Sequence, residues 1–229
     1  MNTRVTTIGI LVAASMVSGM ATAAVSGNIG VTSNYLWRGV TQTNDAVAVQ
    51  GGLDYEHESG LYLTSWASNV DFGDETSYEL DLGVGYSNSI GEFAYDIGYV
   101  YYAYPDAVDK IDIGEIYGSI GWNWLTIGYS HFVNASDGIV SEGVDSKDYG
   151  YLTADIGIPV NETYSINIHY GYSSGDVIED WFEKKNYSDY NIALNAETSI
   201  GTVSFMISDT DLNSDDPKVI LGYSFGFDL

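Results

Sequence analysis

The 229-residue chain has no cysteine, three prolines and only seven lysine and arginine residues. Without cysteine it has no disulfide framework, thiolate metal site or cysteine nucleophile. Against the seven basic residues stand 32 Asp and Glu, so the formal net charge is −25. Such an acidic surface repels phosphate backbones, which argues against a nucleic-acid partner. Aromatic residues and glycine are plentiful, with 20 tyrosines and 26 glycines, which excludes a disordered acidic chain.

Long apolar runs are lacking as well. Residues 1–23 contain one basic residue, Arg4, then a short apolar stretch over 8–17 and a small-x-small ending at 21–23. This pattern predicts a cleaved secretory signal peptide, because the apolar stretch falls well short of the roughly 20 residues of a spanning helix. We expect residues 24–229 to form a single domain, in which Arg38 is the only arginine.

The apolar residues of 24–229 recur with a period of two, which predicts β-strands with one apolar face. In 78–86, for example, large apolar residues alternate with Glu79, Asp81 and two glycines. Two segments are irregular: Trp66 has the opposite parity to its apolar neighbours, and the alternation slips near Gly114, as at a bulge. The predicted strands are 27–38, 45–56, 61–70, 77–87, 92–102, 111–121, 124–133, 147–158, 164–174, 187–197, 202–209 and 218–228.

The connections between these twelve segments alternate between short and long. An even number of strands of about 9–11 residues, with short turns at one rim and long loops at the other, is typical of an outer-membrane barrel. The alternative is a soluble periplasmic β-sandwich. Tyr, Phe and Trp at the ends of the apolar stripes favour the membrane, because aromatic residues gather at its interfaces. The predicted fold is therefore an all-β, transmembrane, antiparallel up-and-down β-barrel of about twelve strands, in contact with outer-membrane lipid and lipopolysaccharide.

The last strand carries an aromatic stripe that resembles the signal which outer-membrane barrels present to their assembly machinery. The sequence therefore predicts that machinery as a partner. The residues that share this stripe are Tyr223, Phe225, Phe227 and Leu229.

Residues of the opposite parity are expected to line the lumen. Their excess of carboxylates favours cations and rejects anions in a confined pore, so the sequence predicts passive diffusion of small solutes with a cation preference. We expect Arg38 to pair with one or more of these carboxylates, either as a structural anchor or as a constriction residue that contacts solute. The ionisable lumen candidates are Arg38, Asp54, Glu56, Glu79, Asp81, Asp96, Glu115, Asp155, His169 and Asp189.

One stretch, SNYLWRGVTQT over 33–43, resembles the N-terminal signature of the TorF family of proteobacterial porins. The segments 66–72 and 102–105 and the glycine-tyrosine strands also resemble that family. The resemblance implies an outer-membrane location and a pore function, and it brings no catalytic residue, metal or cofactor. The residues of this chain that match the signature are Ser33, Asn34, Tyr35, Arg38, Gly39, Gln42 and Thr43.

Two other function classes stay open at this stage. A structural or adhesive barrel with a plugged lumen would act through its acidic surface loops; one of these, 209–215, spaces its acidic residues like a calcium loop but lacks the turn glycine and the final glutamate. A phospholipase is the weaker reading: His57 and Ser59 have the required spacing but fall in a predicted turn. The loop 175–186 either folds inward as a constriction or stays outside.

Overall fold

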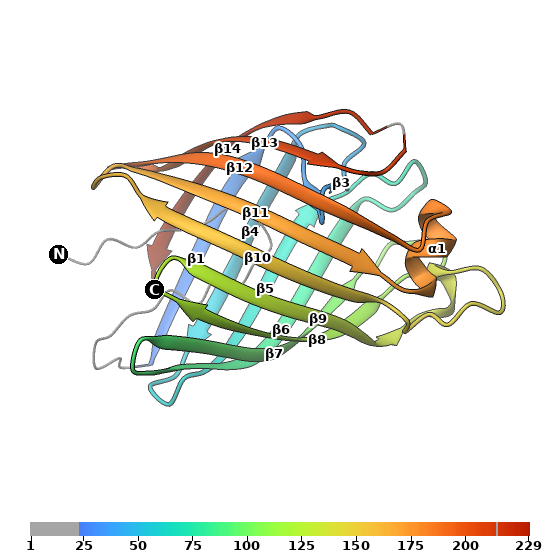
Figure 1. The fold of residues 1–229 in the computed structure, drawn as a ribbon, viewed down its shortest axis with the longest axis horizontal. Coiled ribbons are helices and arrows are strands. Elements are labelled where there is room, and N and C mark those ends of the chain that lie inside the picture. The colour runs from blue at the N-terminus through green and yellow to red at the C-terminus, as the bar shows by residue number, and fades with distance from the viewer. Residues whose placement is uncertain (1–22, 214) are drawn as a thin grey trace.

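The computed structural model describes residues 23–213 and 215–229, so the predicted signal peptide, apart from Ala23, lies outside the described residues. Twelve antiparallel strands close into one barrel (Figure 1). They are β1 Ala24–Thr32, β4 Ala48–Glu56, β5 Leu61–Asn69, β6 Tyr78–Ile90, β7 Phe93–Ala103, β8 Ile113–Trp122, β9 Leu125–Ala135, β10 Gly150–Pro159, β11 Tyr164–Ser174, β12 Asn186–Thr198, β13 Gly201–Thr210 and β14 Lys218–Asp228.

The sheet closes through β1, which pairs with β4 on one side and with β14 on the other. Ser26 is paired with Asp54 of β4 and with Asp228 of β14. Closure pairs the backbone groups of every strand, which a sheet in lipid requires. The sandwich alternative is therefore wrong, and the predicted twelve-stranded barrel is confirmed.

The two faces of the sheet separate by parity, as the period of two predicts. On β7 the outward Ile97 is 62% exposed, whereas the inward Asp96 is buried. On β14 the stripe of Tyr223, Phe225 and Phe227 points outward. The slip near Gly114 is confirmed as a register shift between Gly114 and Glu115 in the pairing of β8 with β9.

The two rims differ in the way the connection lengths predict. Short turns and the described chain ends lie at one rim, and the longer loops lie at the other (Figure 1). The long-loop rim carries the 3₁₀ turn Asp137–Ile139 and the helix α1 Asp176–Phe182. Among residues 23–213 and 215–229, no helix is both long and apolar enough to cross a membrane.

One predicted strand is wrong at its end. The segment 27–38 was expected to be continuous, but β1 stops at Thr32 and β4 starts only at Ala48. Residues 33–47 leave the wall and carry two short strands, β2 Leu36–Trp37 and β3 Val40–Thr41, which pair with each other and not with the barrel. Side chains of this segment contact residues of β6, β8 and β10, and the Arg38 carbonyl accepts a hydrogen bond from Tyr187 of β12, so the segment lies inside the barrel.

Candidate functional site

Residues 33–47 form a hairpin inside the lumen, called the plug hairpin below. Its tip is the pair Arg38 and Gly39, with φ of +51° and +82°. Two consecutive positive φ values are typical of the tight turns that join two-residue hairpins, and glycine adopts them without strain. Arg38 has no such freedom, so the packing around it holds the tip in place. A side chain at position 39 would collide with Thr210 and Asp189 of the wall.

The base of the plug hairpin is a hydrogen-bond network of motif residues. Asn34 accepts a hydrogen bond from Thr41 at 2.7 Å, and its amide donates to Asp45 at 2.7 Å. The Thr43 hydroxyl donates to the Ala46 carbonyl at 2.6 Å. These bonds provide partners for buried polar groups that would otherwise have none. This need for partners explains the polar residues of the signature.

Arg38 projects from the tip to the opposite wall. Its Nη2 lies 2.6 Å from Oε2 of Glu115 on β8, and both side chains are buried. The guanidinium carbon also lies 4.2 Å from the ring centres of Trp37 and Tyr151 and 4.7 Å from that of Tyr149. Burial alone would lower the Arg38 pKa, but the charge of Glu115 raises it, so the guanidinium stays charged. The predicted pairing of Arg38 with a lumen carboxylate is confirmed.

Further contacts fix the hairpin to the β5–β8 side of the barrel. Tyr35 donates to Glu79 of β6 at 2.8 Å. Within the wall, Tyr102 of β7 donates to the second oxygen of Glu115 at 2.9 Å and so holds the carboxylate that Arg38 binds. Burial and the charge of Glu79 raise the pKa of Tyr35, which keeps this hydroxyl a donor. Trp66 meets the Tyr35 ring edge-on at 5.3 Å. The opposite parity of Trp66 in the sequence thus marks a residue that packs against the hairpin.

A second polar group lies on β10, β11 and β12. His169 places Nδ1 2.6 Å from Asp155 and Nε2 3.0 Å from Asp189. Two carboxylate acceptors on the two ring nitrogens fit a protonated imidazole, which donates from both. The Tyr151 hydroxyl reaches both His169, at 3.0 Å, and Asp189. Since Arg38 stacks on the Tyr151 ring, the two polar groups meet at the hairpin tip.

Aromatic rings fill the lumen on the long-loop side of Arg38. Trp37 stacks on Tyr149 at 5.9 Å, and Tyr149 stacks on Phe132 at 4.3 Å. Trp181 of α1 packs against Trp37, and its indole donates to the Ile139 carbonyl at 2.5 Å. The loop 175–186 therefore covers the mouth and contacts the plug hairpin. These inward aromatic residues were not predicted, because a tyrosine on the lumen face looks like a break in the pattern.

The remaining predicted lumen residues lie apart from the hairpin tip. Asp81 is buried beside Glu79, and its Oδ1 has no hydrogen-bond partner among the described residues. Asp96 accepts from the Tyr62 hydroxyl at 2.8 Å. Asp54 accepts from Thr64 at 2.6 Å. Glu56 ends β4 at the short-turn rim and is exposed.

Some ionisable residues with inward parity were not predicted from the sequence, among them Glu197 and Lys218. Glu197 lies near the end of β12, and one of its oxygens is buried without a partner in the described part of the chain. Lys218 begins β14 and pairs with Asp215 in the adjoining loop. Both sit at the ends of predicted strands, where the parity is hardest to assign.

The residues behind the phospholipase and calcium-loop interpretations have local structural roles. In the exposed turn after β4, Nδ1 of His57 lies 2.8 Å from the Ser59 hydroxyl and accepts the Ser59 amide. In the acidic run 209–215, Asp211 accepts the Ser188 amide while Asp215 pairs with Lys218. Within the part of the chain that the structure describes, no three His, Asp or Glu side chains are grouped to hold a metal ion.

Comparison with solved structures shows that this barrel has a fold similar to that of outer-membrane channels. It is similar to the KdgM porin in complex with disordered oligogalacturonate, with a TM-score of 0.57 and 10% identity over 89% of this chain and 99% of that chain. It is also similar to the COG4313 outer membrane channel from Pseudomonas putida F1, with a TM-score of 0.54 and 11% identity over 92% of this chain and 97% of that chain. At these identities the likeness establishes the fold.

The sequence of the chain also matches the model of a protein family. Residues 17–222 match the model of a family described as a bacterial protein of unknown function, Gcw_chp. No curated protein matches the chain. The resemblance of 33–43 to the TorF porins is not tested by these matches and stays a prediction.

Proposed function

This chain belongs to the Gcw_chp family of bacterial proteins, and we propose that it is a narrow outer-membrane channel for small solutes that prefers cations. The outer face of the barrel supports the location, because a band of exposed apolar residues such as Ile97 and Leu82 surrounds the strands. A closed sheet with such a band is stable in lipid, where its backbone groups are all paired.

The observation that carries the proposal is the imbalance of charge in the lumen. The inward faces of β4, β6, β7, β8, β10 and β12 carry carboxylates, while the cations paired with carboxylates inside the described barrel are Arg38 of the hairpin, Lys218 of β14 and a protonated His169 of β11. Each of these cations is already paired with carboxylates. The remaining negative charge attracts cations and repels anions in a confined, partly low-dielectric space.

The plug hairpin supports a small conductance. A twelve-stranded barrel is wider than the eight-stranded barrels that side chains fill and narrower than the open porins. Here the hairpin and the aromatic rings of Trp37, Tyr149 and Phe132 occupy the half nearer the long loops. The similar KdgM porin holds oligogalacturonate, a polyanion. The acidic lumen of this chain supports a different solute, of the opposite charge.

Planar-bilayer recording under a KCl gradient tests the proposal. We expect unitary currents whose reversal potential lies toward the K⁺ equilibrium value. Neutralising Asp155 and Glu197 by D155N and E197Q is expected to move the reversal potential toward zero, whereas D74N in an outer loop leaves it in place. A reversal potential on the chloride side would contradict the cation preference.

A second candidate function has one observation in its favour. Arg38 and Glu115 are both buried, and the rings around them are closely packed, as in a permanently plugged barrel that acts through its acidic loops. The two functions differ in one measurement. A plugged scaffold gives no current from the folded protein at any gradient.

A further inference from the structure

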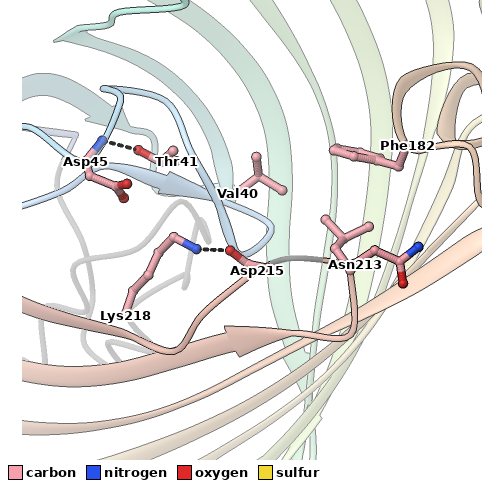
Figure 2. Close-up of a pocket in the computed structure, with 8 residues that line it drawn as sticks. Val40, Thr41, Asp45, Phe182, Asn213, Asp215 and Lys218 are labelled. Carbon is pink, nitrogen blue, oxygen red and sulfur yellow. Dashed lines mark hydrogen bonds and ion pairs between the residues drawn. The ribbon is translucent and has the colours of Figure 1, made fainter.

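A pocket of about 280 Å³ lies at the mouth of the barrel, outside the polar groups described above. Three parts of the chain form it: the plug hairpin, the end of α1 and residues 212, 213, 215 and 218 between β13 and the start of β14 (Figure 2). At roughly 30 Å³ per water molecule, the volume suits a small organic molecule. The pocket is lined by Val40, Thr41, Asp45, Phe182, Leu212, Asn213, Asp215 and Lys218.

The charges of the pocket do not cancel. Lys218 pairs with Asp215, whose second oxygen accepts the Thr210 hydroxyl at 2.6 Å. Asp45 is exposed, and among the described residues its carboxylate is bonded by the neutral Asn34 amide and not by a cation. The pocket therefore carries one uncompensated negative charge, in a mouth that is itself acidic. Such a field concentrates cations and repels anions.

The apolar part of the pocket selects the kind of cation. Figure 2 shows the Phe182 ring pointing from the end of α1 toward Val40, with Asp45 and Lys218 on the far side. Phe182 is half-buried, because one side of its ring packs on Tyr187 at 5.2 Å. A cation near the free part of an aromatic ring gains a cation–π interaction, and alkyl groups gain from apolar neighbours. A hydrated metal ion gains neither, because its water shell separates it from the ring and it carries no alkyl group.

We propose that this mouth pocket binds a small organic cation, an alkylammonium whose charge faces Asp45 and whose alkyl groups face Phe182 and Leu212. The inference deepens the proposed function and rests on it, since it names the class of solute that the channel first meets. Val40, Thr41 and Asp45 belong to the plug hairpin, so the bound cation lies directly against the segment that narrows the lumen.

Binding is tested on the full-length barrel in detergent micelles by calorimetric titration with choline chloride. We expect saturable binding of choline, with KCl and glucose giving none under the same conditions. D45N and F182L are each expected to weaken choline binding about three- to fivefold, as an exposed ion pair and an exposed cation–π contact would. D109N removes the same charge from the same rim outside the pocket and is expected to leave the affinity unchanged.

Three results would overturn the inference: no choline binding, equal heats with choline and KCl, or a loss in D109N equal to that in D45N. Each variant is first checked for the heat-dependent gel mobility of a folded barrel. Because the titration needs no current, its outcome is separate from that of the channel proposal. Choline binding in a protein that conducts no ions would support the proposed pocket and contradict the proposed channel.

Discussion

Arg38 and Glu115 form a buried ion pair at 2.6 Å although they are 77 positions apart in the sequence. One residue is the tip of the plug hairpin and the other lies on the wall of the barrel, at the point where the register of β8 against β9 shifts. Gly114 pairs with Asn134 and Glu115 with Phe132, so the extra residue of the bulge lies on β9. The irregularity between β8 and β9 and the inward hairpin thus meet at one contact.

Removing the Arg38 side chain is expected to loosen the plug hairpin. In R38A the Glu115 carboxylate loses its charged partner, a change that costs about 3–5 kcal/mol when the remaining charge stays buried. Releasing the hairpin lets water reach Glu115, so we expect the hairpin to open before the barrel unfolds. Hydrogen exchange of amides 33–47 should become faster. R38K keeps the charge but loses the planar stacking and should be intermediate. Unchanged exchange in R38A would contradict this role.

Gly39 offers a test of the hairpin tip with a matched control. G39A places a methyl group at φ of +82°, within 2.5 Å of Thr210 and 2.7 Å of Asp189. Gly73 has the same φ in an outer loop, but a Cβ there meets no atom within 4 Å. Both changes carry a backbone cost of roughly 1 kcal/mol. G39A alone adds crowding, so it should speed exchange of amides 33–47 while G73A should not. Equal effects would show that the tip does not fit tightly against the wall.

The pH dependence of α1 follows from two acidic residues of the long loops. The charge of Asp148 raises the pKa of Asp176, so its ionised form is disfavoured in the folded state. Stability from this group is therefore present at low pH and is lost as the pH rises through the raised pKa. D176N should slow hydrogen exchange of amides 176–182 at neutral pH and have no effect near pH 3, below the ordinary carboxyl range.

Asp106 provides a control, because its pKa is shifted in the opposite direction to that of Asp176. Hydrogen bonds from Ser77 lower the pKa of Asp106, so its contribution is present at neutral pH and lost as the pH falls through the lowered pKa. D106N should therefore speed exchange around Ser77 at neutral pH. A D176N protein that also exchanges faster at neutral pH would contradict the assigned repulsion.

The membrane-facing surface is tested by two lysine substitutions at equally exposed sites. Ile97 is 62% exposed in the middle of β7, and Val108 is 70% exposed in a long loop. I97K places a charge in lipid and should lower the unfolding free energy by about 2–4 kcal/mol in vesicles. V108K stays in water and should change it by less than about 0.5 kcal/mol. Similar values for both variants would mean that the outer face of the sheet is not in lipid.

The strands could be predicted because alternation records which face of a sheet each residue occupies. Twelve segments, the even count and the bulge at Gly114 all follow from parity, and the structure confirms them. The plug hairpin could not be predicted in this way, because Tyr35 and Trp37 keep the parity of the apolar residues of β1. Two signals pointed to it: the polar pair at 44–45 ends any strand there, and Trp66 faces inward to meet Tyr35.

The candidate site was predicted only in part for a related reason. The carboxylates of the lumen follow from parity, but their partners lie on distant strands, and no pattern in one sequence joins Tyr35 to Glu79 or Tyr151 to Asp189. Inward tyrosines are also hard to recognise. Tyr62 lies over Gly85 of the neighbouring strand, so the signal is an aromatic residue beside a cross-strand glycine rather than an apolar stripe.

The most direct test of the account compares unitary conductance of the native chain with that of a variant in which 34–46 is replaced by a short Gly-Ser linker. Thr32 and Ala48 are partners in the sheet, so a short linker joins them without disturbing the barrel. If the plug hairpin narrows an acidic channel, the variant should show a larger unitary conductance and the same preference for K⁺ over Cl⁻. A folded variant whose conductance is no larger than that of the native chain would contradict the account.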